Sequence, residues 1–265
     1  MVTRPVVEVS DLRHAYADGT SALRGVSFQV GDGERLAIVG ANGAGKSTTL
    51  LHLAGCLLPQ AGSVRIAGLP LCRDTLAPLR RCVGLLFQNP DDQLFMPRVF
   101  DDVAFGPLNL GLPADEVRTR VMHALAVVGA THLAQRQPHR LSGGEKRAVT
   151  IAAVLSMSPT ILLLDEPTAA LDPRSRRQLI ELLQTLGQTI IVATHDLDLV
   201  LDLCPRTLVL GEGSVIADGA SGIILRDEAL LAAAHLEKPL RLQSCPVCRG
   251  VSGQAASGCH SSNRV

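Results

Sequence analysis

RLAIVGANGAGKS, residues 35–47, is the stretch that decides the fold of this chain. The short apolar run Arg35–Val39 predicts a buried strand, and the segment from Lys46 to Cys56 predicts a helix directly behind the loop. Residues 40–47 match every fixed position of the pattern G-x-x-x-x-G-K-[ST]. Glycines let backbone N–H groups turn onto phosphate oxygens, and the helix N-terminus adds favourable partial charge. The stretch therefore predicts a nucleotide-binding loop.

This loop and the first turn of its helix are expected to hold ATP with Mg²⁺. Lys46 is expected to reach the β- and γ-phosphates, and Ser47 to hold the metal ion. The loop pattern alone indicates nucleotide binding and does not separate one P-loop family from another. The nucleotide-binding residues predicted in this stretch are Gly40, Ala41, Asn42, Gly43, Ala44, Gly45, Lys46, Ser47 and Thr48.

A second apolar run, Ile161–Leu164, ends in two carboxylates, Asp165 and Glu166. In open α/β sheets a buried strand delivers its C-terminal residues to the crevice where ligands bind. Asp165 suits the Mg²⁺ shell, through a water molecule, and Glu166 is the natural base to polarise an attacking water. A strand end with two solvated acids is the alternative, and the phosphate loop in the same chain makes it a minor one.

Strands and helices alternate along the chain. Apolar strands are expected at residues 83–87, 161–164, 189–193 and 206–210. This alternation predicts an α/β fold with a mostly parallel sheet that is covered on both faces. From residue 90 to about 155 the strand pattern disappears, and Glu116–Val128 carries apolar residues at helical spacing. We therefore expect a helical insert in an α/β frame.

Composition narrows the class of function. The chain of 265 residues has 25 basic and 25 acidic side chains, so no overall field favours nucleic acid. No apolar run approaches a membrane-spanning length, and the first residues lack the apolar region of a signal peptide. Work at a membrane would therefore need a partner. Seven cysteines, an odd number, indicate reduced thiols, and the first four are expected to be small core residues.

LSGGEKR, residues 141–147, precedes a further apolar-periodic helix. Ser142 followed by two glycines at a helix start makes a second anion site, although in isolation it would pass for an ordinary N-cap. The stretch resembles the signature sequence of ABC (ATP-binding cassette) ATPases. The resemblance covers about residues 5–220, and other family motifs follow in order: the glutamine Gln88, the D-loop Ala169–Asp172 and the switch histidine His195.

The resemblance implies a fold and a site. The fold is a P-loop NTPase (RecA-like) α/β domain with an N-terminal antiparallel β subdomain and an inserted α-helical subdomain, about residues 90–155. The cassette spans 1–220, and 221–265 is a C-terminal extension whose last residues, roughly 20, are expected to be flexible. Glu166, His195, Gln88 and Lys46 take catalytic roles. Ser47, Gln88 and Asp165 face Mg²⁺, and Tyr16 stacks on adenine or is a core tyrosine.

The family also implies a dimer. ATP lies between the phosphate loop of one subunit and Ser142, Gly143 and Gly144 of the other. One chain has one phosphate loop and one signature, so it needs a second copy of itself or a paralogous ATPase.

Gln88–Phe95, QNPDDQLF, points to one branch of the family. With Asp101–Pro107 and Asn109–Leu112 it resembles the energy-coupling-factor ATPases, which drive uptake of vitamins or of cobalt and nickel ions. That branch implies a transmembrane coupling subunit, a substrate-specific membrane subunit and a peripheral place on the cytoplasmic side of the cell membrane. The ending from Glu237 to Cys245 resembles the metal branch, so we favour cobalt or nickel over a vitamin.

Two other classes of ATP-binding protein share parts of this pattern. A soluble, non-transport ABC ATPase of DNA repair or translation usually carries two cassettes, coiled coils or basic arms, which this sequence lacks. A regulatory P-loop protein that does not hydrolyse ATP would not need Glu166 and His195. The tail residues Cys245 and Cys248, with Cys259 and His260, have metal-ligand spacing, yet incidental thiols in a flexible tail are the more frequent case.

Overall fold

The computed structural model describes residues 5–243, in which the strands form two sheets. The strands are β1 (Pro5–Ala15), β2 (Ser21–Gly31), β3 (Arg35–Val39), β4 (Ala61–Ile66), β5 (Leu69–Pro70), β6 (Val83–Leu86), β7 (Ile161–Asp165), β8 (Thr189–Ala193), β9 (Arg206–Gly211) and β10 (Ser214–Ala220).

Helices connect and cover these strands. The α-helices are α1 (Lys46–Leu53), α2 (Leu76–Cys82), α3 (Val99–Asn109), α4 (Ala114–Val127), α5 (Gly143–Leu155), α6 (Pro173–Thr185), α7 (Leu197–Leu203), α8 (Ser221–Ile224) and α9 (Glu228–Ala233). Short 3-10 turns lie at Arg73–Thr75, Pro90–Asp92, Thr131–Leu133, Pro138–Arg140 and Leu240–Leu242.

The main sheet has the strand order β10-β9-β3-β8-β7-β6. Neighbours from β9 to β6 run parallel, and β10 runs antiparallel to β9. The central strands are buried on both faces: in β3, Leu36 and Ile38 enter one core, whereas Ala37 and Val39 enter another. Burial on both faces explains why these strands are continuously apolar in the sequence instead of alternating.

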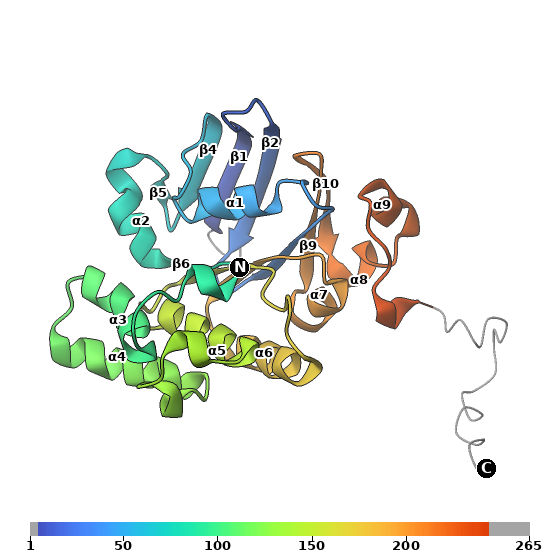
Figure 1. The fold of residues 1–265 in the computed structure, drawn as a ribbon. Helices are drawn as coiled ribbons and strands as arrows, with labels where there is room; N and C mark the ends of the chain where they lie inside the picture. Colours follow the sequence, from blue (N-terminus) through green and yellow to red (C-terminus); the bar gives the residue numbers. More distant parts are fainter. Residues whose placement is uncertain (1–4, 244–265) are drawn as a thin grey trace, which may run out of the picture.

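A smaller antiparallel sheet, in the order β2-β1-β4-β5, faces one side of the main sheet. Helix α1 lies between the two sheets (Figure 1), and its Leu50 and Leu53 share a core with Val7 of β1 and Ile38 of β3. The helix that begins at the phosphate loop is therefore fixed from both sides.

Helices α5, α6 and α7 cover the opposite face of the main sheet (Figure 1). The C-terminal helices α8 and α9 extend this second core, because Leu225 and Leu231 are buried in it. A third core joins α3, α4 and α5 through residues such as Val103, Val121 and Val149. Every described element from the turn at Pro90 to the end of α5 is helical.

The expected fold class is confirmed: a mostly parallel main sheet, an N-terminal antiparallel sheet and a helical insert are all present. One expectation was wrong. Of the first four cysteines only Cys204 is buried; Cys82 is partly buried, and Cys56 and Cys72 are exposed. Cys56 follows the end of α1, where the chain leaves the core, and Cys72 opens a surface 3-10 turn. No helix in residues 5–243 has both the length and the apolar character that crossing a membrane requires.

Candidate functional site

Four neighbouring strands of the main sheet bring the predicted motifs to one edge. Gly40 follows β3, Thr194 and His195 follow β8, Asp165 ends β7, and Gln88 comes shortly after β6. Because β3, β8, β7 and β6 are adjacent and parallel, their carboxyl ends meet at the same edge. This edge is where open α/β sheets bind ligands.

Two glycines of the phosphate loop, Gly40 and Gly45, lie where the surrounding backbone leaves no room for a side chain. A Cβ atom at Gly40 would lie 2.3 Å from the carbonyl oxygen of Leu210. Gly45 has a left-handed backbone, φ 101°, and its Cβ would lie 2.7 Å from the carbonyl oxygen of Ala22. The loop therefore packs directly against β2 and β9, and this packing fixes where its N–H groups lie.

Lys46, the first residue of α1, is buried in this loop. Its Nζ donates to the carbonyl oxygens of Gly40 at 2.8 Å and of Ala41 at 3.1 Å. Burial lowers the pKa of Lys46, and the nearby carboxylates of Glu166 and Asp165 oppose that shift. The ammonium group thus lies inside the curve of the loop, in position to meet phosphate oxygens.

Glu166 is held by three hydrogen-bond donors that follow β8. Its Oε2 accepts from the Thr194 hydroxyl at 2.9 Å. Its Oε1 accepts from the His195 backbone N–H at 3.0 Å and pairs with the His195 ring Nδ1 at 2.7 Å. The carboxylate is buried, 7% exposed, and the Glu166 backbone is left-handed with φ 43°. The carboxylate and the histidine ring therefore act as one unit at the sheet edge.

Asp165 and Ser47 together fit a magnesium ion. Burial raises the pKa of Asp165, while a hydrogen bond with the Ser47 hydroxyl and the charge of Lys46 act to lower it. Asp165 Oδ1 is a buried oxygen without a hydrogen-bond partner among the described residues. A carboxylate with a spare oxygen beside a hydroxyl is the hard oxygen donor set that Mg²⁺ prefers.

A cavity of about 370 Å³ lies over the loop and joins residues from distant parts of the sequence. Tyr16 stands at its edge, 40% exposed, with its hydroxyl 3.0 Å from Thr48 Oγ1. The exposed Gln88 lies on the same wall as Glu166 and His195. Its lining residues are Tyr16, Thr20, Ser21, Ala22, Asn42, Gly43, Gly45, Lys46, Ser47, Thr48, Gln88, Glu166 and His195.

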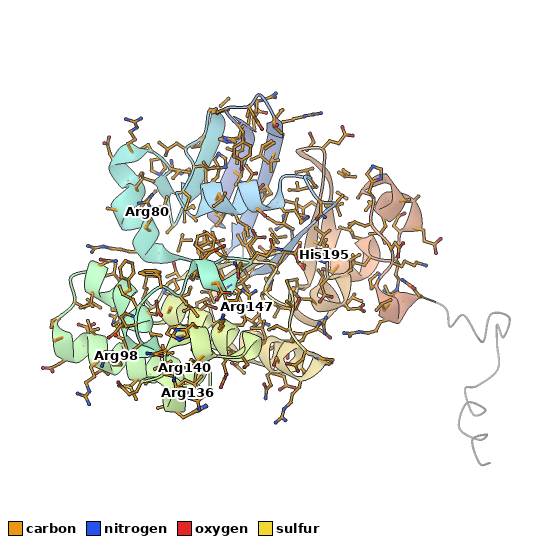
Figure 2. All side chains as sticks on the ribbon, in the orientation of Figure 1. Arg80, Arg98, Arg136, Arg140, Arg147 and His195 are labelled. Carbon is orange, nitrogen blue, oxygen red and sulfur yellow. The ribbon has the colours of Figure 1, made fainter. Side chains whose placement is uncertain are left out.

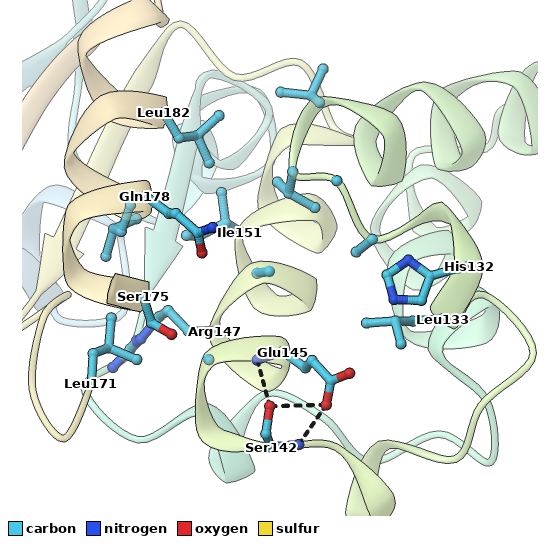
Figure 3. A pocket seen from close by; sticks show the side chains of 17 residues that line it. His132, Leu133, Ser142, Glu145, Arg147, Ile151, Leu171, Ser175, Gln178 and Leu182 are labelled. Carbon is cyan, nitrogen blue, oxygen red and sulfur yellow. Dashed lines mark hydrogen bonds between the residues drawn. The ribbon is translucent and has the colours of Figure 1, made fainter. Parts of the chain in front are cut away.

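The signature residues lie elsewhere. Ser142 caps α5 by accepting from the Glu145 N–H at 3.3 Å, and Glu145 Oε2 accepts in return from the Ser142 N–H at 2.8 Å. Ser142 and Gly144 line a second cavity, about 460 Å³, between α5 and α6 (Figure 3). A Cβ atom at Gly144 would lie 2.6 Å from Ser175 Oγ, so a larger residue there would displace the Ser175 side chain. The two cavities share no lining residue, so the chain does not bring its signature to its own phosphate loop.

Arg147 links the signature helix to the loop that follows β6. Its guanidinium donates to the carbonyl oxygens of Phe87 at 2.8 Å and of Gln88 at 2.6 Å. Arg147 is only 2% exposed, and burial lowers its pKa to about 10. Figure 2 places it in the interior, whereas Arg98, just before α3, and Arg136, between two 3-10 turns, lie farther out in the helical insert. Arg147 belongs to the LSGGEKR motif, but the sequence does not predict this contact, because Phe87 lies 60 residues earlier in the chain.

Asp196 is a second residue whose role the sequence does not predict. It caps α7 by accepting from the Leu199 N–H at 2.9 Å, and it accepts from Arg176 of α6 at 3.0 Å and from Thr168 at 3.1 Å. Burial alone would raise the pKa of Asp196, but the hydrogen bonds from Arg176 and Leu199 hold it below its ordinary value. Asp196 thereby ties the segment after Glu166 to the segment that carries the histidine.

The C-terminal segment is fastened to the same helix. Asp198 of α7 accepts from the Leu240 N–H at 3.0 Å, and Arg241 donates to Asp202 at 2.7 Å. Within residues 5–243 no group of three or more His, Cys, Asp and Glu side chains is arranged to hold a metal ion. The candidate ligands Cys245, Cys248, Cys259 and His260 lie outside the described residues.

Comparisons with known proteins agree with this geometry. Residues 23–169 match the model of the ABC transporter family. The chain is 60% identical, over 92% of its length and 98% of the relative's, to a putative ABC transporter ATP-binding protein of Geobacter sulfurreducens. It is 48% identical to the energy-coupling factor transporter ATP-binding protein EcfA of Methanothermobacter thermautotrophicus, over 88% of this chain and 77% of that one.

Two solved structures are similar in fold and sequence. CbiO1 of Clostridium perfringens, part of the ABC transporter complex cbiONQ, superposes with a TM-score of 0.77 at 41% identity, over 86% of this chain and 93% of that one. The ATP-binding cassette MJ0796, seen as a dimer bound to ADP and Pi after hydrolysis, has a TM-score of 0.73 at 29% identity, over 81% and 98%.

The family match covers more than half of the chain, and the relatives align along nearly all of it. Residues of the phosphate loop, Glu166 of the acid pair and His195 line one cavity, at the edge where their adjacent parallel strands end. This chain belongs to the ABC transporter family, as an ATP-binding subunit that hydrolyses ATP to drive transport.

Proposed function

We propose that this chain is the ATPase of an energy-coupling-factor importer and that the ion imported is cobalt or nickel. The observation that carries the ATPase assignment is the single cavity that gathers Lys46, Gln88, Glu166 and His195. The importer branch is supported by the sequence of Gln88–Phe95 and by the similarity to proteins named EcfA.

The residues in this cavity divide the work of hydrolysis. Lys46 neutralises the β- and γ-phosphates, and the loop N–H groups hold their oxygens. Ser47, Asp165 and Gln88 would hold Mg²⁺, which would supply positive charge beside the phosphates. Glu166 accepts the proton of the attacking water, and His195 orients the Glu166 carboxylate through the Nδ1 contact. In the present arrangement Glu166 Oε1 accepts two hydrogen bonds and Oε2 accepts one, so Oε2 retains a lone pair for the attacking water.

The site is completed by a second subunit. Ser142, Gly143 and Gly144 begin a helix whose N-terminus favours anions, yet they lie away from the phosphate loop of their own chain. In a two-fold dimer each signature would cover the nucleotide of its partner, and both sites would carry the full set of residues. A homodimer is the simplest assembly, and a paralogous ATPase is the alternative.

A groove on the helical side fits a membrane subunit. Its volume is about 620 Å³, and three of the five phenylalanines in the chain line it: Phe87, Phe95 and Phe105. Phe95 is 62% exposed. Its ring packs edge to face with the Phe105 ring, and the two ring centroids are 5.1 Å apart. Asp102 lies in the same groove, 4% exposed, with its Oδ2 unpartnered among the described residues. Exposed aromatic rings around a buried carboxylate suit an amphipathic helix with a basic residue.

This groove is connected to the nucleotide cavity. Phe87, on the groove wall, precedes Gln88 in the cavity wall, and Arg147 holds the carbonyl oxygens of both. Lys146, next to Arg147 on α5, forms a salt bridge with Asp91, with its Nζ 2.6 Å from Asp91 Oδ1. The segment from Phe87 to Asp91 therefore joins the proposed membrane contact, the nucleotide and the signature helix, which supports a transport role over a soluble, non-transport ATPase.

The choice of ion rests on the C-terminal sequence and on one similar structure. The sequence from Glu237 onward resembles the metal branch, and the chain superposes on CbiO1 of the complex cbiONQ. Substrate choice belongs to a membrane subunit. A vitamin importer with two different ATPases is the alternative.

Uptake measurements test this proposal. The chain is co-expressed with the membrane proteins encoded beside it in a host without cobalt and nickel importers, and uptake of radiolabelled Co²⁺ and Ni²⁺ is followed. We expect uptake above that of cells carrying Lys46→Ala, since loss of the ammonium removes ATP turnover. Labelled vitamins serve as the matched substrates.

Uptake of a vitamin with no uptake of either ion would replace the metal assignment by the vitamin branch. If the purified chain carries no membrane protein with it and none of the substrates accumulates, the transport role itself is wrong. ATP hydrolysis by the purified chain, measured in parallel, separates these results from a simple failure to fold.

A further inference from the structure

Two histidines lie beneath Tyr16, and neither belongs to a motif discussed above. The His14 ring, on β1, meets the Tyr16 ring edge to face, with centroids 4.9 Å apart and planes at 84°. The His52 ring, on α1, packs against the His14 ring in turn. The two centroids are 4.8 Å apart, with planes at 77°. His14 is 8% exposed and His52 is fully buried.

These rings close a circle of contacts through Thr48. Tyr16 Oη lies 3.0 Å from Thr48 Oγ1, and His52 Nδ1 lies 2.8 Å from the Thr48 carbonyl oxygen. A carbonyl oxygen only accepts, so His52 Nδ1 carries a proton. Tyr16, His14, His52 and Thr48 thus connect the end of β1 to the first turns of the helix that starts at the phosphate loop.

The circle restricts the Tyr16 ring on the side away from the cavity. With its T-shaped contact to the His14 ring and its hydroxyl beside Thr48, the Tyr16 ring has two fixed points, while the residue is 40% exposed and lines the nucleotide cavity. A face-on stacking surface gains affinity for a base only when its orientation is set before binding. Thr48 is next to Ser47, so the same circle fixes the ring relative to the phosphate and metal positions.

Core filling alone does not account for these residue types. His14 Nδ1 and His52 Nε2 are buried without a hydrogen-bond partner among the described residues. Burying an unpaired polar atom is unfavourable, and an apolar side chain of similar volume would avoid it. Burial also lowers the pKa of His52, which keeps its ring neutral beside His14.

We propose that His14 and His52 are positioning residues that hold the Tyr16 ring at the angle at which it stacks on adenine, and so determine the affinity for ATP and not the rate of its hydrolysis. This inference rests on the proposed role of Tyr16 as the adenine platform. In this proposal, the His14 and His52 rings contribute to the affinity for adenine although they do not contact the base.

The test compares a ligand that has a base with one that has none. KM and kcat for ATP are measured in the full-length protein, together with the competitive inhibition constant of inorganic tripolyphosphate, which engages only the phosphate loop. His14→Leu keeps a side chain of similar volume but removes the aromatic ring, whereas His14→Phe keeps an aromatic ring. His52→Leu and His52→Phe form the second matched pair.

We expect His14→Leu to raise KM for ATP by about three- to tenfold, the order of one aromatic contact. The inhibition constant of tripolyphosphate and kcat should stay within about twofold of wild type. His14→Phe should restore KM, and the His52 pair should behave in the same way. Equal weakening of ATP and tripolyphosphate in His14→Leu would show a disturbed phosphate loop and overturn the inference, as would a His14→Phe protein that fails to recover.

Tyr16→Ala separates this inference from the role of Tyr16 itself. If Tyr16→Ala raises KM for ATP while His14→Leu and His52→Leu leave it unchanged, Tyr16 is the platform and the histidines do not position it. If Tyr16→Ala has no effect on KM, the platform role is wrong, and the inference built on it fails as well.

Discussion

Glu166 shows how much of the chemistry depends on the surroundings of one residue. Its carboxylate is buried, and all three of its donors come from the two residues that follow β8. The sequence predicted the acid from its place after an apolar strand, and the family resemblance implied His195. It did not predict Thr194, because a threonine after an apolar strand carries no signal of its own.

Replacing Glu166 with Gln should separate binding from hydrolysis. The amide keeps the size of the side chain and an oxygen that can accept from the His195 N–H, but it cannot take a proton from water. We expect ATP turnover to fall by about a hundredfold or more while ATP still binds. The protein should then persist as a dimer in ATP on size-exclusion chromatography.

Lys46→Ala is the matched control, since it should lose nucleotide binding and never form the ATP-bound dimer. Wild-type turnover in the Glu166→Gln protein would show that another group acts as the base. Turnover lost without any ATP-dependent dimer would leave the base assigned and refute the signature contact in trans.

At the scale of elements, strand patterns were predictable and helix contacts were not. The continuous apolar runs of β3, β7 and β8 follow from burial on both faces, which a sequence displays directly. Helix α3 is harder to predict, because Gly106 and Pro107 interrupt its pattern while third-core contacts hold it. The contact of Arg147 with the loop after β6 depends on how α5 packs, and local sequence does not encode that packing.

Asp102, in the first turn of α3, gives an element-scale prediction. Its Oδ1 accepts from the N–H groups of Phe95 and Met96, both at 3.0 Å, so it shapes the groove wall. Asp102→Asn keeps this acceptor and removes the charge, so stability at pH 7 should stay within about 1 kcal/mol of wild type. Asp102→Ala removes the acceptor of two partly buried N–H groups, those of Phe95 and Met96, and should cost about 1 kcal/mol for each. Urea unfolding measures both.

The pH dependence follows from the sign of the pKa shift. Burial raises the pKa of Asp102, with the like charge of Asp101 adding to the shift and the two backbone N–H groups opposing it. The folded state then binds this proton more tightly than the unfolded chain, so the group contributes more stability as pH falls towards its raised pKa. Any advantage of Asp102→Asn at pH 7 should therefore shrink on acidification to pH 4. An advantage that grows instead would contradict the raised pKa.

The same variant tests the groove. If Asp102 faces a basic residue of the membrane subunit, Asp102→Asn should keep the ATPase activity of the isolated protein and reduce its co-purification with that subunit. Full retention of the membrane subunit would exclude Asp102 from the contact.

Across the whole molecule, the C-terminal segment belongs to the folded body more than the sequence suggested. The sequence placed the end of the cassette near residue 220, because its strand and helix patterns weaken there. Yet Ile224, Leu225 and Leu231 are buried in the second core, and Arg241 pairs with Asp202 of α7. Short helices give weak periodicity, so their burial could not be inferred from pattern alone.

A chain ending at Ala220 should therefore be strongly destabilised. Burial of these three aliphatic side chains contributes about 1.5–3 kcal/mol each. Together they account for a large part of the free energy of unfolding of a typical domain. A chain ending at Gln243 keeps every described contact and is the matched control. Guanidinium unfolding of both proteins gives the comparison; equal midpoints would show that the folded cassette ends at residue 220, as the sequence predicts.

The strand order of the main sheet also has a consequence for synthesis of the chain on the ribosome. Both neighbours of β3 are far downstream, since Arg35 pairs with Ile190 and Leu36 with Arg206. At about 5–20 residues per second, the strand in front of the phosphate loop waits roughly 10–30 s for its first partner. During that interval an apolar strand is unpaired and prone to aggregate, and no nucleotide site exists to stabilise it. ATP can therefore assist folding only after translation is nearly complete.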